Sequence, residues 1–281
     1  MRKTVQGSFG WSDVPCAPYP ELPSILRHLV DGVQHELSEN LVGVYLVGSL
    51  ATGDFDLDSD IDFLVAIRNE LSDEVVGSLQ ALHAKIYEIG CYPAQHLEGS
   101  YITQIVLNRA DMIEKPLWYL DNGSIVFERS AHDNRWHVRW VLRERGITLV
   151  GPNPKSLLEP VPVELLYNEV SGLMRYISDL FAADLNGPLS YWTSRFGQSY
   201  TVLTYCRMLH TLKTGTVQSK LAGMNWALQN LDPKWAKFIK QAWKERKGVR
   251  HMVKIRQRAL QPALEETMAF IKYAVREIDH M

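Results

Sequence analysis

Apolar side chains recur at every third or fourth position between residues 21 and 39, a spacing that predicts an amphipathic helix. Two short apolar runs at 42–47 and 61–67 predict strands, and a second helical pattern covers 71–88. We expect a third strand at 97–107. Because helices alternate with strands, the first half of the chain is predicted to be an α/β region with a mixed sheet.

Prolines mark a break after this region. Four of the thirteen prolines lie in the segment 151–162, which therefore cannot be the interior of a helix. Beyond it the pattern is helical, with apolar positions three and four residues apart at 165–181 and 264–278. We predict two domains, residues 1–157 and residues 158–281. The expected fold class is α+β for the first domain and all-α for the second.

Asp60 and Asp62 open the second apolar run and are separated by one residue. Successive side chains of a strand point to opposite faces, so both carboxylates should project from one face while Ile61 and Phe63 project from the other. Two parallel carboxylates a few ångströms apart repel each other unless a cation lies between them. The expected occupant is a hard divalent ion such as Mg²⁺.

Gly48 and Ser49 end the preceding apolar run, and ten residues separate them from the carboxylates. Gly48 offers a backbone without a Cβ, and Ser49 offers a hydroxyl group. If a helix follows, its first amide N–H groups can hold a phosphate. We expect this pair to bind the phosphates of a nucleotide.

Glu98 lies at the start of the third predicted strand and is the candidate third carboxylate. Such a trio beside a phosphate-binding turn is typical of two-metal phosphoryl-group transfer, in which the ions neutralise a triphosphate and stabilise the leaving pyrophosphate. Glu98 would bind an ion or take the proton of the acceptor hydroxyl as general base. A lone Gly-Ser pair indicates a turn and a lone Asp-x-Asp a solvated edge; their combination favours the metal site.

Composition narrows the class of partner. With 281 residues, of which 46% are apolar, the chain can bury a core, and we expect a folded protein rather than a disordered one. The formal net charge of −2 gives no electrostatic reason to expect a nucleic acid, so we expect a small-molecule substrate. Cys16, Cys91 and Cys206 fit no zinc or redox spacing and are predicted to be reduced thiols. No apolar stretch approaches the roughly 18 residues needed to span a bilayer, and we expect a cytoplasmic protein.

The motif Gly48-Ser49, ten residues, Asp60-Ile61-Asp62 resembles the signature of the polymerase-β-type nucleotidyltransferase superfamily. From about residue 20 onward the layout is similar to that of the aminoglycoside 3''/9-adenylyltransferases, which modify streptomycin and spectinomycin. Further matches lie in both predicted domains: Leu97-Glu98, Leu149-Val150-Gly151-Pro152, Glu159-Pro160-Val161-Pro162, Leu203-Thr204-Tyr205-Cys206-Arg207, and Thr214-Gly215 with Lys220 and Trp226-Ala227.

The resemblance implies an enzyme that transfers AMP from ATP to a hydroxyl group of a small molecule bound between the domains. The implied acceptor is an aminoglycoside or aminocyclitol antibiotic such as spectinomycin, and the implied cofactor is Mg²⁺, as two ions. The first domain would bind ATP and the ions, and the helical domain would bind the acceptor. We expect a monomer.

The resemblance also implies roles for single residues. Asp60, Asp62 and Glu98 would hold the ions, and Glu98 would activate the acceptor hydroxyl. Ser49, beside Gly48, would contact the phosphates of ATP. Arg207 and Lys220 match residues of the helical domain that reach back to ATP, in agreement with the need of a triphosphate for cations beyond the two ions.

One departure from the family concerns the acceptor. In the streptomycin-modifying members, acidic residues about fourteen and ten positions before the arginine receive the cationic drug. Those positions are Thr193 and Gly197 in this chain. A pocket without acidic partners loses its main means of holding ammonium and guanidinium groups. The departure favours an acceptor that carries less charge than streptomycin.

Four further residues are candidates for contact with the substrate. Trp118 lies near a position where the family keeps a tryptophan against the drug, although a place in the core is the alternative. His132 and Asp133 precede an apolar helical pattern; they line a pocket, or Asp133 caps that helix. Trp192 is the fourth candidate and is expected to line the cleft.

Two other functions remain open. The segment from Lys234 to Arg258 contains ten Lys or Arg residues and one acid, Glu245, which is typical of solvated helix faces and also of a surface for an anionic partner. The second hypothesis is therefore a nucleotidyltransferase that modifies RNA or protein. The third is a catalytically silent nucleotide-binding module, against which the intact trio of acids argues.

Overall fold

The computed structural model describes residues 18–247 and 251–278. Cys16 and Arg250 lie outside these ranges; Cys91 and Cys206 are both free thiols. The chain divides between Val161 and Pro162 into two units, each with its own hydrophobic core. The boundary expected after residue 157 falls shortly before this division.

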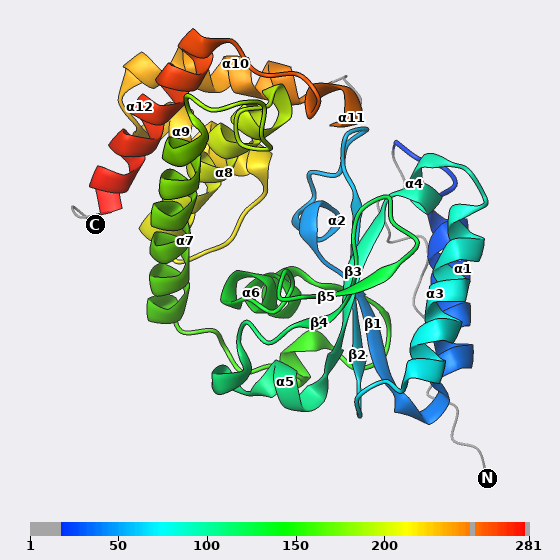
Figure 1. Cartoon of the computed structure of the whole chain (residues 1–281). Helices are drawn as coiled ribbons and strands as arrows, with labels where there is room; N and C mark the ends of the chain where they lie inside the picture. Colours follow the sequence, from blue (N-terminus) through cyan, green and yellow to red (C-terminus); the bar gives the residue numbers. More distant parts are fainter. Residues whose placement is uncertain (1–17, 248–250, 279–281) are drawn as a thin grey trace. The chain divides into compact units, whose positions relative to one another are not determined.

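A six-stranded sheet forms the centre of the first unit, in the order β5-β4-β3-β2-β1-β6 (Figure 1). The strands are β1 Leu41–Leu46, β2 Ile61–Ile67, β3 Leu97–Thr103, β4 Leu117–Leu120, β5 Phe127–Ser130 and β6 Ile147–Val150. Only β2 and β3 are paired in parallel, and the other four pairings are antiparallel. The prediction of a mixed sheet is confirmed.

Helices α1 and α3 lie side by side against one face of the sheet (Figure 1). They are α1 Leu22–Leu37 and α3 Asp73–Tyr87, and α4 Tyr92–Gln95 follows α3 before the chain enters β3. The buried positions of α1 have the predicted spacing: Leu22, Ile25, Leu26, Leu29, Val30, Val33 and Leu37. Ser72 begins α3 because its hydroxyl accepts a hydrogen bond from the Val75 amide. This helical crossover allows β2 and β3 to run in parallel.

The remaining helical segments of the first unit are short. They are α2 Gly48–Thr52, α5 Gln104–Asn108 and α6 Trp136–Arg145, with 3₁₀ turns at Ser38–Asn40, Ala110–Met112 and Pro154–Ser156. The third strand ends earlier than expected, because the Thr103 hydroxyl accepts a hydrogen bond from the Val106 amide and begins α5. The predicted strand 97–107 is therefore a strand followed by a helical turn.

The second unit is helical within the described residues. Its helices are α7 Val163–Asp184, α8 Arg195–Thr214, α9 Lys220–Asn230, α10 Ala236–Arg246, α11 His251–Lys254 and α12 Gln261–Ile278, with a 3₁₀ turn at Pro233–Trp235. Helix α8 packs against α7, α9, α10 and α12 and is buried on most sides. The prediction of an α+β domain followed by an all-α domain is confirmed. None of the helices in the described ranges is both long enough and apolar enough to cross a membrane.

Candidate active site

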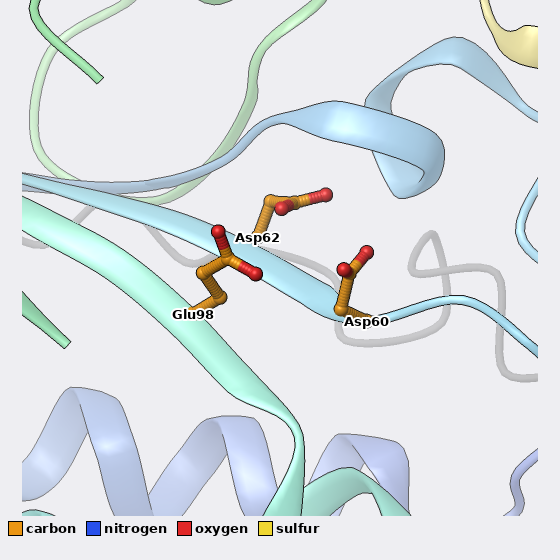
Figure 2. Close-up of side chains that lie close together, drawn as sticks. All are labelled: Asp60, Asp62 and Glu98. Atoms are coloured by element: carbon orange, nitrogen blue, oxygen red, sulfur yellow. The ribbon is translucent and has the colours of Figure 1, made fainter. Parts of the chain in front are cut away.

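Three carboxylates meet where β2 and β3 begin (Figure 2). Asp60 directly precedes β2, Asp62 is its second residue, and Glu98 is the second residue of β3. The parallel register places Asp62 beside Glu98. One carboxylate oxygen from each of the three residues lies within 4.8 Å of the others. Their oxygen donors and their closeness fit a divalent cation such as Mg²⁺.

The opposite face of β2 is part of the core, as the alternation of side chains predicts. Ile61 and Phe63 are completely buried there. Phe63 stacks on His83 of α3, with 5.5 Å between the ring centroids. This packing fixes the orientation of β2, so Asp62 must project from the other face.

Gly48 lies against Asp62. The antiparallel pairing of β1 with β2 brings the end of β1 beside Asp62, whose backbone oxygen accepts a hydrogen bond of 3.0 Å from the Val47 amide. A Cβ atom on Gly48 would lie 1.7 Å from Oδ2 of Asp62, and the residue has a φ of 57°. Both facts require glycine at this position.

Ser49 follows as the second residue of α2. Its Oγ atom is buried, and no group of the described residues forms a hydrogen bond with it. A buried hydroxyl without a partner is costly, so this atom fits a ligand oxygen such as that of a phosphate. The predicted phosphate-binding pair thus lies directly beside the carboxylates.

Glu98 is held in an electrostatically unfavourable place. Burial, together with the negative charges of Asp62 and Asp60, raises its pKa to about 9. The hydrogen bond from Tyr119 lowers it. A bound cation would relieve both the burial and the repulsion, which again agrees with a metal site.

Tyr119 and His132 contact one oxygen of Glu98. The Tyr119 hydroxyl donates a hydrogen bond of 2.5 Å to Oε1, and the same hydroxyl lies 3.1 Å from Oδ1 of Asp121. His132 places Nε2 at 3.4 Å from Oε1 and stacks on the ring of Tyr119. Sequence reasoning proposed His132 for the site and missed Tyr119, because no local pattern marks the strand position opposite Ser100.

Asp133 is not a helix cap, so this expectation is wrong. Helix α6 begins at Trp136, three residues later, and no side chain caps it. The Oδ2 atom of Asp133 instead accepts a hydrogen bond of 2.7 Å from Ser100, which projects from the same face of β3 as Glu98. Burial raises the pKa of Asp133. Its place near Glu98 agrees with the other interpretation, a residue that lines the site.

Asn122 is a second residue that the sequence did not indicate. Its side-chain amide donates to Oδ2 of Asp60 at 3.4 Å, and its Oδ1 lies 2.7 Å from Nδ1 of His96. It belongs to the turn between β4 and β5, where Gly123 has a φ of 78°. The turn therefore brings a polar side chain to the carboxylates from a part of the chain 62 residues away from Asp60.

Trp118 lies on the other face of the sheet from the carboxylates. It is paired with Tyr101, whose ring packs edge-on against Phe63 at 6.3 Å between centroids. Its side chain is partly buried against the core, and the guanidinium of Arg129 lies 4.9 Å from its ring. This position favours the core interpretation, and Trp118 is not included in the candidate site.

The second unit carries the two predicted cationic residues on neighbouring helices. Arg207 is in α8, and Lys220 begins α9. The two helices approach closely, because a Cβ atom on Gly223 would lie only 2.6 Å from the Cα atom of Arg207. The ammonium group of Lys220 lies 5.0 Å from the ring of Tyr200, two turns before Arg207 in α8.

The two positions that lack acids are part of the packing of the second unit. Thr193 is completely buried, and its hydroxyl forms hydrogen bonds with the amide and hydroxyl of Ser190. A Cβ atom on Gly197 would lie 1.8 Å from the backbone oxygen of Tyr191. Trp192, which directly precedes Thr193 in the sequence, is partly buried against the core of the second unit. The local backbone therefore leaves no room for an acidic side chain at residue 197.

Comparison with known families gives two matches. Residues 26–112 match the nucleotidyltransferase domain, and residues 173–274 match the C-terminal domain of aminoglycoside adenylyltransferases. These matches confirm the resemblance inferred from the sequence. They also confirm the prediction that the chain is a nucleotidyltransferase of the adenylyltransferase type.

Similar proteins carry related names. The chain is 23% identical to the spectinomycin 9-adenylyltransferase of Campylobacter jejuni, over 79% of this chain and 84% of that protein. It is 25% identical to the aminoglycoside (3'') (9) adenylyltransferase of Escherichia coli, again over 79% and 84% of the two chains. The crystal structure of spectinomycin adenyltransferase AAD(9) from Enterococcus faecialis with ATP and spectinomycin has the same fold, with a TM-score of 0.65 at 16% identity over 90% of this chain and 98% of that chain.

Proposed function

We propose that this adenylyltransferase moves AMP from ATP onto a hydroxyl group of an aminocyclitol antibiotic such as spectinomycin. The observation that carries the proposal is the trio Asp60, Asp62 and Glu98, with ligand atoms within 4.8 Å of one another. Gly48 and Ser49, beside the trio, supply the turn for phosphate. The named activities of the similar proteins support the choice of donor and acceptor.

The residues of the first unit divide the work of the reaction. The backbone of Gly48 and the buried Ser49 hydroxyl would bind phosphate oxygens of ATP. Asp60, Asp62 and Glu98 would hold Mg²⁺, as two ions, which supplies charge neutralisation for the triphosphate. The acceptor oxygen forms a bond to the α-phosphorus, the bond from that phosphorus to the β-phosphate oxygen breaks, and pyrophosphate leaves.

Glu98 would take the proton that the acceptor hydroxyl loses. A bound cation would lower the pKa of Glu98, which burial and the two aspartates raise, so that the carboxylate is ionised near neutral pH and can accept this proton. Arg207 and Lys220 as further ligands of the ATP phosphates stay a prediction that rests on the resemblance alone.

Spectinomycin is a better proposal than streptomycin for the acceptor. The positions at which streptomycin-modifying relatives carry acids are Thr193 and Gly197, and the backbone contact at Gly197 leaves no space for an acidic side chain. A strongly cationic drug would lose its ion pairs there. The acceptor is therefore proposed to be a less charged aminocyclitol.

The test is an assay of pyrophosphate release with ATP and Mg²⁺ and a panel of acceptors: spectinomycin, streptomycin, other aminoglycosides and lincosamides. We expect turnover with spectinomycin and at least tenfold lower kcat/KM with streptomycin. Glu98→Gln should fold, bind ATP and form no product, whereas Glu74→Gln, an exposed acid in α3, should keep wild-type turnover. Wild-type turnover by Glu98→Gln would remove Glu98 from the mechanism.

A macromolecular acceptor is the second candidate, and one observation favours it. Lys237, Lys240 and Lys244 are exposed along α10, and Glu245 pairs with Arg195. An RNA acceptor belongs in the same assay. Transfer to RNA with a steep dependence on salt, and none to the drugs, would support this candidate over the first.

A further inference from the structure

Oε1 of Glu98 is contacted by two side chains that have no part in the reaction proposed above. We propose that Tyr119 is a positioning residue for adenylyl transfer: its hydroxyl, steadied by His132, holds Oε1 of Glu98 and leaves Oε2 for the ion or the acceptor hydroxyl. This inference rests on the proposed function, because it assigns different tasks to the two oxygens of the proposed base.

The pairing of β3 with β4 brings Tyr119 to Glu98. Ser100 lies directly opposite Tyr119, so Glu98, two residues before Ser100, is a diagonal neighbour on the same face. Diagonal neighbours across a strand pair are within reach of an aromatic side chain. The phenol spans this distance, and its hydroxyl lies 2.5 Å from Oε1, which is typical of a strong hydrogen bond to a charged oxygen.

The phenol has one proton and two carboxylates near it. Oε1 of Glu98 is at 2.5 Å and Oδ1 of Asp121 at 3.1 Å. The proton goes to the shorter contact, and Asp121, which is exposed, keeps its contact with water instead. Glu98 is therefore the main hydrogen-bond acceptor of the Tyr119 hydroxyl.

His132 keeps the phenol in this orientation. The two rings are stacked, with 5.2 Å between centroids and 26° between planes. Nε2 of His132 lies 3.4 Å from the same Oε1 atom. Tyr119 is itself only 4% exposed, so its ring cannot turn away without disturbing β4. Two independent contacts thus converge on a single oxygen of Glu98.

Restraint of Glu98 matters because its side chain has three rotatable bonds. A base or a metal ligand must lie within about 0.5 Å of its working position, and a misplacement of about 1 Å can lower the rate about 100-fold. The neighbouring charges of Asp60 and Asp62 repel Glu98 and favour other rotamers. A strong donor on Oε1 opposes that repulsion and keeps the carboxylate at the trio.

The experiment compares Tyr119→Phe with Tyr101→Phe in the full chain. Both variants remove one hydroxyl from a buried tyrosine of the same strand pair. Tyr101 is the control, because its hydroxyl contacts Nε2 of His83 at 2.9 Å on the opposite face of the sheet. For Tyr119→Phe we expect kcat with spectinomycin to fall about 10- to 100-fold, with KM for ATP within about twofold of wild type. For Tyr101→Phe we expect lower thermal stability and unchanged kcat.

Two results overturn the inference. One is a kcat of Tyr119→Phe within twofold of wild type while Glu98→Gln is inactive, which leaves the proposed function intact. The other is an equal fall of kcat in both tyrosine variants, which assigns the effect to sheet stability. If Glu98→Gln itself keeps its turnover, the role of Glu98 in the proposed function fails first. The three variants therefore separate the two failures.

Discussion

At Gly48 the chain has no space for a side chain, because the carboxylate of Asp62 occupies that space. The atom that a Cβ would strike is Oδ2 of Asp62, and the left-handed φ of 57° adds a conformational penalty for any other residue. Gly53, at the end of the same short helix, also has a positive φ, of 84°, but nothing lies within 4 Å of its Cβ position. Both glycines have a positive φ, but only at Gly48 would a Cβ atom clash with another residue.

Gly48→Ala should therefore abolish most activity. The added methyl group displaces the carboxylate of Asp62, and we expect kcat to fall by about 100-fold or more. Gly53→Ala should keep wild-type kcat and lose about 1 kcal/mol in the free energy of unfolding. Steady-state kinetics and denaturant unfolding measure both effects. Equal losses of kcat in the two variants would show that backbone strain, not Asp62, is responsible.

The residues of the candidate site that could be predicted from the sequence are those marked by a local pattern. The alternation in β2 and the spacing to Gly48 indicated Asp60 and Asp62, and the start of the next apolar run indicated Glu98. Tyr119 and Asn122 were missed because they reach the trio through the β3–β4 pairing and the turn after β4. Nothing in the local sequence determines which residue lies opposite Ser100.

At the scale of elements, one strand shows how a local hydrogen bond overrides an apolar run. Val106 and Leu107 are apolar and follow directly after the strand residues, so the sequence 97–107 predicts one continuous strand. Both side chains are in fact buried. The Thr103 hydroxyl accepts from the Val106 amide, and the chain turns into α5. A buried helical turn and a buried strand have the same apolar composition, and periodicity alone cannot separate them.

Close packing of α8 and α9 depends on Gly223. A Cβ atom there would lie 2.6 Å from Cα and 2.9 Å from the backbone nitrogen of Arg207, so the helices would have to separate. Gly223→Ala should lower the free energy of unfolding of the second unit by about 2 kcal/mol. Gly172→Ala, in α7 with nothing within 4 Å, should raise it by up to about 1 kcal/mol. Denaturant unfolding distinguishes the two, and stabilisation by both would contradict the close contact.

At the scale of the whole molecule, the small net charge is the sum of an acidic first unit and a basic second unit. Residues 1–161 contain 13 Lys or Arg and 22 Asp or Glu, whereas residues 162–281 contain 17 and 10. The first unit is thus acidic, and it also contains the partly buried carboxylates Asp60, Asp62 and Glu98. Its stability should depend on cations and on pH more than the overall charge suggests.

This dependence has a definite sign. The pKa of Glu98 is higher in the folded chain, at about 9, than its ordinary value of 4.5, so the folded state holds this proton more tightly. Its contribution to stability is full below pH 4.5 and is lost as the pH rises toward 9. Without divalent ions, we expect the free energy of unfolding to fall by about 1–3 kcal/mol between pH 6 and 8.5, and Mg²⁺ to restore it.

The measurement is denaturant unfolding at both pH values, with EDTA or with Mg²⁺. Glu98→Gln should remove most of the pH dependence and most of the effect of Mg²⁺, whereas Glu74→Gln should change neither. The idea is refuted if wild type and Glu98→Gln lose the same stability at pH 8.5 in EDTA.

The sequence by itself determined the helices α1, α3, α7 and α12, the strands β1 and β2, the side of β2 from which Asp60 and Asp62 project, and the closeness of Gly48 and Ser49 to that strand along the chain. These follow from short-range rules, namely the alternation of side chains and the spacing of apolar residues. The tertiary structure alone decided that Tyr119 and Asn122 meet the trio, that Trp118 faces the core, and that Gly197 has no room for an acid. Each of these depends on strand register or on the approach of distant backbone, which no local pattern encodes.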